Sequence, residues 1–115
     1  MQVQKIELTG LGFGGDFAAE ESYKTLLSNI QFCGGDVKLI SITSCFPNEG
    51  KTTISIELSR ELAEAGKKVL LIDADMRNSR VVQKHTRAKG IKGLSQLLSG
   101  QISLTEALYE TQYKG

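Results

Sequence analysis

The sequence predicts an α/β fold built around a parallel sheet, on the basis of three neighbouring segments. Residues 37–44 form an apolar run that suits a core strand, and residues 52–65 form an amphipathic helix that ends at Gly66. Residues 69–72 are an uninterrupted apolar run, which suits a parallel strand buried on both faces. Strand, helix and strand make a βαβ unit, whose crossover should be right-handed. The helix is expected to bury its apolar residues, namely Ile54, Ile56, Leu58, Leu62 and Ala63.

The segment before this unit predicts a short strand and a long helix. Residues 3–8 suit a short strand, and a glycine-rich linker follows it. Asp16 can cap a helix that runs as far as Phe32, where a pair of glycines ends it. We therefore expect a flexible segment over residues 1–15 and one domain over residues 16–115. Residues at helical spacing are expected to face the core: Tyr23, Leu26, Leu27 and Ile30.

The segment after the unit predicts short helices. The chain is polar and basic as far as Lys92, and its single histidine, His85, is expected at the surface. Residues 93–98 suit a short helix that ends before Gly100. Ser103 to Glu106 has the pattern of a capping box, which predicts a last helix toward Tyr109 or Tyr113.

Composition excludes several classes of protein. The chain has 115 residues, enough for one small domain, and a net charge of +1, which gives no field for nucleic acid or an anionic membrane. Its apolar runs are too short to span a bilayer, and its first residues do not resemble a signal peptide, so a cytoplasmic location is expected. Two cysteines, Cys33 and Cys45, make neither a disulfide framework nor a metal-binding spacing.

The loop between the first expected strand and the helix has the residues of a phosphate-binding loop. Gly50 allows close backbone approach, the first helical amides favour an anion, Lys51 can reach terminal phosphates, and the hydroxyl of Thr52 can join a magnesium shell. Cys45 stands where the usual pattern has its first glycine, so a proline-containing turn with an exposed lysine is the alternative. The candidate nucleotide-binding residues are Pro47, Asn48, Glu49, Gly50, Lys51, Thr52 and Thr53.

Two carboxylates, Asp73 and Asp75, follow the second expected strand two residues apart, so both can point the same way. Ligands of open α/β sheets bind at the carboxyl ends of strands, the edge where the phosphate loop also lies. Beside bound phosphates, one carboxylate can ligate magnesium and the other can orient or deprotonate a hydroxyl. The alternative is a solvated acidic turn with Arg77 as a local ion pair.

Together these segments resemble the cytoplasmic catalytic domain of bacterial tyrosine kinases of the capsular and exopolysaccharide type. Residues 21–32 are similar to the family's helix before its first core strand, and residues 47–53 to its Walker A loop. Residues 70–77 match its Walker A′ motif, and residues 93–100 resemble the segment that follows. The resemblance implies a P-loop NTPase fold with three αβα layers, of which this chain would be the N-terminal half.

The resemblance also implies the reaction, transfer of the γ-phosphoryl of ATP to tyrosines on sister subunits. Lys51 would hold the β- and γ-phosphates, Thr52 and Asp73 would bind Mg²⁺, and Asp75 would be the base. The implied catalytic residues are thus Asp75, Lys51 and Asp73, and the implied cofactors are ATP or ADP with Mg²⁺. The implied partner is a membrane-anchored polysaccharide co-polymerase that activates the kinase at the inner face of the membrane.

The chain departs from the family pattern in three ways. The family's domain is longer and has a Walker B aspartate after a later strand, so residues 1–115 alone are expected to show little kinase activity. The family has a C-terminal tyrosine cluster, which Tyr109 and Tyr113 do not reproduce. Where its ring-forming helix has Glu, Arg and Arg, this chain has Glu21, Lys24 and Leu27, which weakens the expected homo-oligomer.

Two other functions remain open from the sequence. One is a partitioning or positioning ATPase of the same deviant Walker superfamily, but those relatives carry a lysine near the start of the loop, where this chain has Phe46. The other is a nucleotide-binding fragment or regulatory partner that performs no catalysis.

Overall fold

The first long helix, α1, spans Phe17–Phe32 in the computed structural model, which describes residues 3–46, 50–76 and 79–115. Its N-cap is Asp16, whose Oδ1 accepts a hydrogen bond of 3.1 Å from the amide of Ala19. The helix ends at Cys33, and Gly34 follows with a φ of 121°. The capping prediction and the helix bounds are therefore confirmed.

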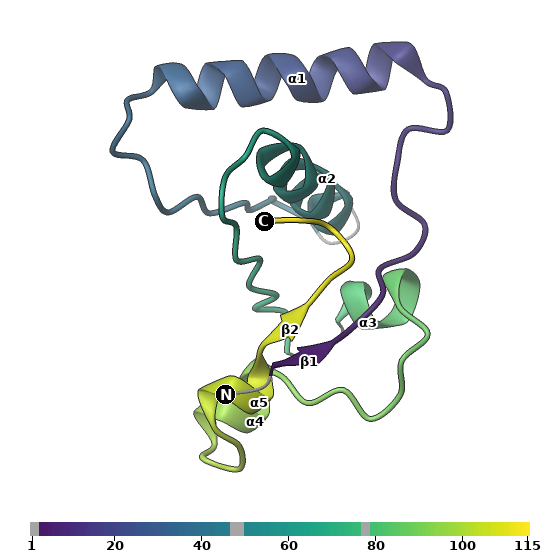
Figure 1. Cartoon of the computed structure of the whole chain (residues 1–115), viewed down its shortest axis with the longest axis vertical. Coiled ribbons are helices and arrows are strands. Elements are labelled where there is room, and N and C mark those ends of the chain that lie inside the picture. The colour runs from purple at the N-terminus through teal and green to yellow at the C-terminus, as the bar shows by residue number, and fades with distance from the viewer. Residues whose placement is uncertain (1–2, 47–49, 77–78) are drawn as a thin grey trace. The chain divides into compact units, whose positions relative to one another are not determined.

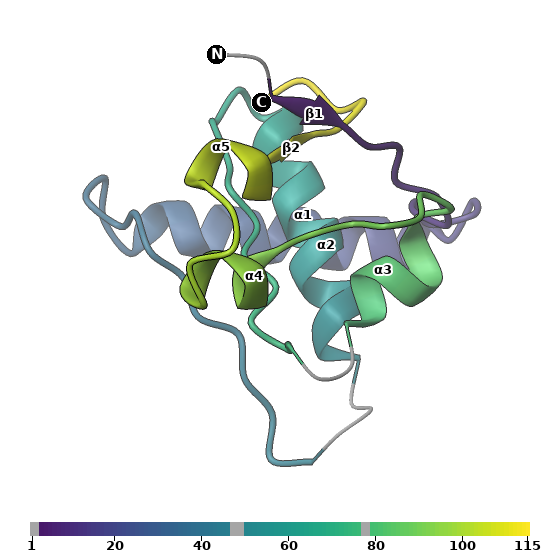
Figure 2. The ribbon, with the colours of Figure 1, turned by 90° about the horizontal axis from the view of Figure 1, so that it is seen from below.

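The second long helix, α2, spans Lys51–Glu64 and lies across α1 (Figures 1 and 2). It ends as predicted, because Gly66 takes a φ of 90° just beyond it. Ile56 and Leu58 are buried at 2% and 4% exposure, whereas Ile54 and Leu26, both expected in the core, are exposed. The contact between the two helices therefore covers only part of each predicted apolar face.

The chain divides into two compact units, and each is described by itself. We call Gly12–Leu71 with Gly115 the helical unit, because it contains α1 and α2. We call Met1–Leu11 with Ile72–Lys114 the mixed unit, because it contains the strands and the short helices α3, α4 and α5.

The two predicted core strands, residues 37–44 and 69–72, do not form strands in the structure. Several of their apolar side chains are exposed, with Leu39 at 86% and Leu70 at 65%. A strand requires a ladder of hydrogen bonds to a neighbouring strand, and neither run forms one among the described residues. The amide of Val69 donates a bond of 2.7 Å to the carbonyl of Gly115. The structure contains helices and a parallel sheet, as an α/β chain should, but the sheet is not at the predicted place.

The sheet of the mixed unit has two parallel strands (Figure 1). Strand β1, Gln4–Lys5, pairs with β2, Tyr109–Glu110, so that Gln4 lies opposite Tyr109. The amide of Ile6 extends the ladder with a bond of 2.8 Å to the carbonyl of Glu110. The strand expected over residues 3–8 is thus confirmed at its centre.

Three short helices complete the mixed unit. Helix α4 spans Leu94–Leu98, as predicted, and α5 spans Leu104–Ala107 behind the predicted capping box. The prediction that this last helix continues to Tyr109 or Tyr113 is wrong, because Leu108 is extended and Tyr109 pairs in the sheet. Helix α3, Arg80–His85, was not predicted, although its N-cap Ser79 is a recognisable signal.

His85 lies inside the mixed unit, so its predicted surface position is wrong. Its side chain is 8% exposed, and its Nδ1 lies 3.0 Å from the carbonyl oxygen of Thr9. The amide of Thr9 donates a bond of 2.7 Å to the carbonyl of His85. These contacts join the N-terminal segment to the end of α3. His85 therefore has a role in packing.

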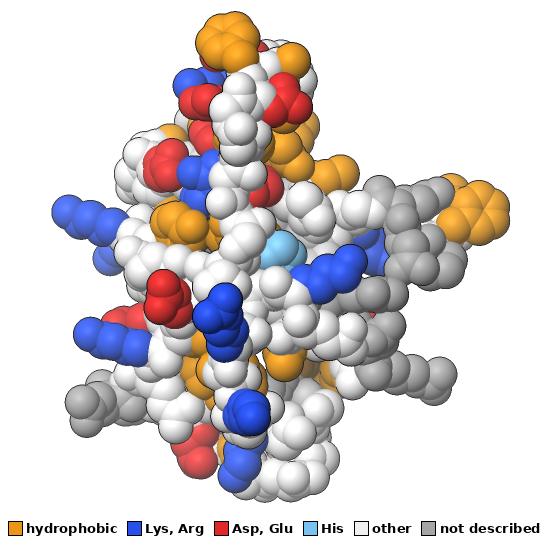
Figure 3. Space-filling view, turned by 90° about the vertical axis from the view of Figure 1, so that its right-hand side faces the viewer, with side chains coloured by type: hydrophobic (Ala, Val, Ile, Leu, Met, Phe, Trp, Pro, Cys, Tyr) orange, Lys and Arg blue, Asp and Glu red, His pale blue; other side chains and the backbone are white. Residues whose placement is uncertain are grey.

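Much apolar surface remains in contact with solvent. Figure 3 shows hydrophobic side chains, in orange, exposed among the charged ones. Phe17, Phe32 and Phe46 are among the exposed apolar residues. Within the described part of the chain, no helix has the length and apolar character needed to cross a membrane.

Candidate nucleotide-binding site

The N-terminus of α2 carries the described half of the phosphate loop. Gly50 is the N-cap, with φ 85° and ψ 14°, a left-handed conformation that favours glycine. Lys51 and Thr52 occupy the first two helical positions, and both are half-buried. Because glycine offers no side-chain cap, the first-turn amides remain available to an anion. The predicted ligands Pro47, Asn48 and Glu49 lie outside the described residues.

The carboxylate pair is organised around Asp73, which is half-buried. Its Oδ1 accepts a hydrogen bond of 3.0 Å from the backbone amide of Asp75, and its Oδ2 accepts one of 2.6 Å from the hydroxyl of Ser79. Asp75 itself is exposed. The side chain of Asp73 is therefore bonded to the backbone of Asp75. That the two carboxylates point the same way stays a prediction, and Arg77, the alternative ion-pair partner, lies outside the described residues.

The two halves of the predicted site belong to different units. Gly50 to Thr53 lie in the helical unit, and Asp73 and Asp75 lie in the mixed unit. That the loop faces the carboxylates therefore stays a prediction.

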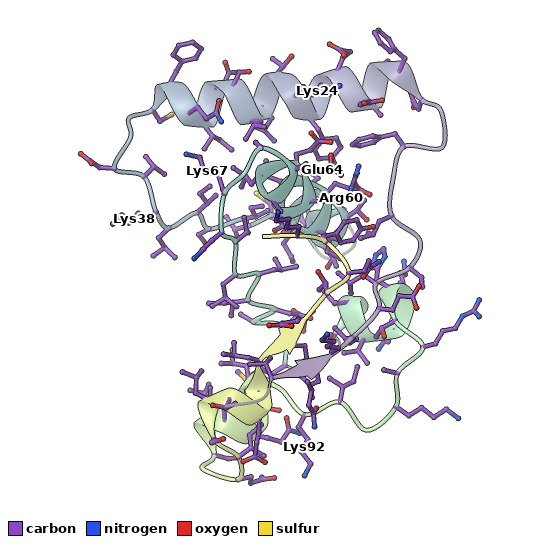
Figure 4. The ribbon with its side chains drawn as sticks, in the orientation of Figure 1. Lys24, Lys38, Arg60, Glu64, Lys67 and Lys92 are labelled. Carbon is purple, nitrogen blue, oxygen red and sulfur yellow. The ribbon has the colours of Figure 1, made fainter. Side chains whose placement is uncertain are left out.

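A buried ionic cluster on α2 was missed by the sequence analysis. Glu57 and Glu61 are 4% and 7% exposed, and the guanidinium of Arg60 lies between them. Its Nε is 3.1 Å from Glu57 Oε2. Its Nη1 is 2.8 Å from Glu64 Oε1, and Figure 4 labels these two residues. The spacing of these residues, three and four apart, was the available signal.

The glycine-rich linker is anchored on this cluster. The amide of Gly12 donates a hydrogen bond of 2.8 Å to Glu57 Oε1. The ring of Phe13 lies 5.1 Å from the ring of Tyr23 and 5.1 Å from the Arg60 guanidinium carbon. Burial, and then the charge of Glu57, raise the pKa of the Tyr23 hydroxyl. The linker thus joins α1 to α2 through packed aromatic and charged groups.

The cluster predicts a pH dependence of stability. Burial raises the pKa of the Glu61 carboxyl above its ordinary 4.5, and Glu64 raises it further, while Arg60 and Lys24 oppose the rise. A carboxyl with a raised pKa binds protons more tightly in the folded chain than in the unfolded chain. Its contribution to stability is therefore largest at acid pH and falls as the pH rises through the folded pKa. As the pH rises above 4.5, the free energy of unfolding should therefore fall less for Glu61→Gln than for the wild type.

Chemical denaturation at a series of pH values tests this dependence. Glu7→Gln is the control, because Glu7 is an exposed carboxylate of the mixed unit. If the free energy of unfolding had the same pH dependence in the wild type and in Glu61→Gln, the Glu61 carboxyl would titrate alike in the folded and the unfolded chain, and the prediction would fail.

Helix α1 carries Glu21, Lys24 and Leu27, the residues compared above with the family's ring-forming helix. Lys24 pairs with Glu20 at 3.0 Å and approaches Glu21 at 4.0 Å, and all three are solvent-accessible (Figure 4). Leu27 is half-buried. Within this chain Lys24 therefore serves as a partner for two glutamates of its own helix.

The remaining candidate side chains have local partners. The Tyr109 hydroxyl donates to the carbonyl of Lys92 at 2.9 Å and accepts from its amide at 3.1 Å. Tyr113 is half-buried. Cys33 and Cys45 are exposed free thiols.

Comparison with known proteins gives a consistent family. The model of a family described as an AAA domain matches residues 37–115. Tyrosine-protein kinase CpsD of Streptococcus pneumoniae is 46% identical over 93 residues, which are 81% of this chain and 41% of that protein. Its namesake in Streptococcus agalactiae is 47% identical over 93 residues, 80% of this chain and 40% of that protein.

A third relative comes from another genus. Tyrosine-protein kinase YwqD of Bacillus subtilis (strain 168) is 39% identical over 98 residues, 82% of this chain and 40% of that protein. The chain thus spans about two fifths of the length of these relatives. No solved structure matches it significantly.

Proposed function

Because this chain belongs to the AAA-domain family, and because its relatives are named tyrosine-protein kinases, we propose that it is the nucleotide-binding part of a protein-tyrosine kinase. The proposed reaction is transfer of the γ-phosphoryl of ATP to tyrosine hydroxyls, and it would regulate capsular or exopolysaccharide synthesis.

The observation that carries the proposal is the N-terminus of α2. A left-handed Gly50 leads into a helix of 14 residues whose first two side chains are those of Lys51 and Thr52. A helix of this length presents aligned amides and the positive end of its dipole to an anion. A lysine and a hydroxyl at that end are the groups that a nucleotide phosphate and its magnesium ion require.

The proposal gives each residue a role. The loop Pro47 to Thr53 holds the phosphates, Lys51 neutralises the β- and γ-phosphates, and Asp75 accepts the proton of the attacking tyrosine. Catalysis of this kind rests on positioning and charge neutralisation, which these groups supply without a covalent intermediate.

The residues proposed to hold magnesium fit that ion. The hydroxyl of Thr52 and the carboxylate of Asp73 are the hard oxygen donors that Mg²⁺ prefers. Among the described residues, each Asp73 oxygen accepts one hydrogen bond, from Asp75 or Ser79, and has a further lone pair for a metal or its water. When bound, magnesium would supply neutralisation of the phosphate charge.

The wider arrangement is also part of the proposal. The three αβα layers require residues 37–44 and 69–72, several of whose apolar side chains are exposed, to pair as strands. Residues 16–115 would form the nucleotide-binding domain. The segment expected to be flexible, residues 1–15, makes ordered contacts through Ile6, Thr9 and Gly12. The proposed partners are ATP, sister subunits, and a membrane-anchored polysaccharide co-polymerase that holds the kinase at the inner membrane face.

Nucleotide binding is the first test of this proposal. Mg²⁺-ADP at 100 times its dissociation constant should add about 2.7 kcal/mol to the free energy of unfolding. Lys51→Ala removes the cation at the phosphates and should abolish the response in a thermal-shift titration. Lys67→Ala, a change of the same kind beyond the other end of α2, is the control and should respond like wild type. Equal responses of wild type and Lys51→Ala would contradict the assignment of the loop.

A further inference from the structure

The hydroxyl of Ser79 makes two hydrogen bonds with different consequences. It accepts a bond of 3.2 Å from the amide of Val82, which caps α3, and it donates one of 2.6 Å to Asp73 Oδ2. A serine hydroxyl has one proton and two lone pairs. Because the Val82 amide uses a lone pair, the single proton is directed to the carboxylate.

Asp73 is therefore held at both of its oxygens. The amide of Asp75 fixes Oδ1, and the hydroxyl of Ser79 fixes Oδ2. The first contact lies within the motif itself, while the second comes from six residues further along the chain. A carboxylate restrained in this way loses less rotational freedom when it binds a cation.

We propose that Ser79 is a positioning residue for the magnesium carboxylate: its hydroxyl holds Asp73 in the orientation that receives the metal or its water. The inference rests on the proposed function, because it assigns a supporting contact to the ligand Asp73. Hydrogen-bonding partners of ligating groups orient them, and their loss typically lowers metal affinity by about 10-fold or more.

The two roles of Ser79 can be separated by substitution. Ser79→Ala removes both the cap and the donor, and Ser79→Thr keeps both. Ser79→Gly removes the donor, but glycine is tolerated at an N-cap almost as well as serine. Ser103 caps α5 in the same unit through the amide of Glu106, so Ser103→Ala is the matched control for loss of a cap.

The experiment measures binding of a fluorescent ADP to the 115-residue chain in EDTA and across a magnesium titration. Ser79→Ala and Ser79→Gly should both need about 10-fold more Mg²⁺ for the half-maximal magnesium effect, with binding in EDTA unchanged. Ser79→Thr and Ser103→Ala should match wild type.

Each contrary outcome identifies what failed. A wild type that binds no nucleotide overturns the proposed function and this inference together. A wild type that binds with magnesium, beside a Ser79→Gly variant with the same magnesium midpoint, overturns the role of Ser79 alone. If Ser79→Ala and Ser103→Ala lost magnesium affinity equally, while Ser79→Gly behaved like the wild type, Ser79 would act only as a helix cap. That result would also overturn its proposed positioning role.

Discussion

Replacing Asp75 with asparagine is expected to lower the rate of tyrosine phosphorylation by about 10²–10⁴-fold while leaving nucleotide binding near wild type. An amide cannot accept the proton of the attacking hydroxyl, yet it has nearly the volume of a carboxylate. Asp75 is exposed, and its backbone amide, which holds Asp73, is kept by the substitution. The variant should therefore separate the chemical step from binding.

Mass spectrometry of the native protein measures the initial rate of phosphotyrosine formation. Asp36→Asn is the matched control, because Asp36 is another exposed aspartate and lies in the turn after α1. Lys51→Ala should lose both binding and transfer. Phosphorylation at the wild-type rate in Asp75→Asn would refute its role as the base.

Removing the guanidinium of Arg60 should give the largest loss of stability. Arg60→Ala leaves Glu57, which is 4% exposed, with a buried charge and no cation at hydrogen-bond distance among the described residues. Breaking a buried pair in this way lowers the free energy of unfolding by about 3–5 kcal/mol. The ring of Phe13 would also lose the guanidinium that covers it.

Chemical denaturation of the chain measures this loss. Lys24→Ala breaks an exposed pair with Glu20 and should change stability by less than about 1 kcal/mol. If Arg60→Ala and Lys24→Ala had the same free energy of unfolding, the buried cluster would contribute no more to stability than a surface ion pair does. The double variant Arg60→Leu with Glu57→Leu should recover part of the loss, because it leaves no unpaired charge.

The ends of α1 and α2 and the start of α5 were predicted well because their signals are local. Asp16 bonds to an amide three residues away, and Ser103 and Glu106 form a capping box over the same distance. Gly66 ends α2 through its own backbone freedom. These interactions depend on neighbours in the sequence, so the residue types alone indicated where each helix begins or ends.

The motifs of the candidate site could be recognised in the sequence for a similar reason. A phosphate loop and a carboxylate pair are short motifs whose chemistry depends on a few adjacent residues, and the bond from the backbone of Asp75 to the side chain of Asp73 is such a short-range contact. Their joint role in one site stays a prediction. The link from Asp73 to Ser79 could not be read from the sequence, because a contact between residues six positions apart follows neither the helix period nor the strand period.

The sequence by itself determined where the long helices lie and how they are capped, because short-range hydrogen bonds and spacing decide these features. Only the tertiary structure decided that Tyr109 enters a strand, that His85 is buried against Thr9 and that Glu57 receives the amide of Gly12. Each of these outcomes joins residues more than 40 positions apart. Strand pairing and burial depend on which distant groups supply hydrogen bonds and exclude water, and local patterns of residues do not contain that information.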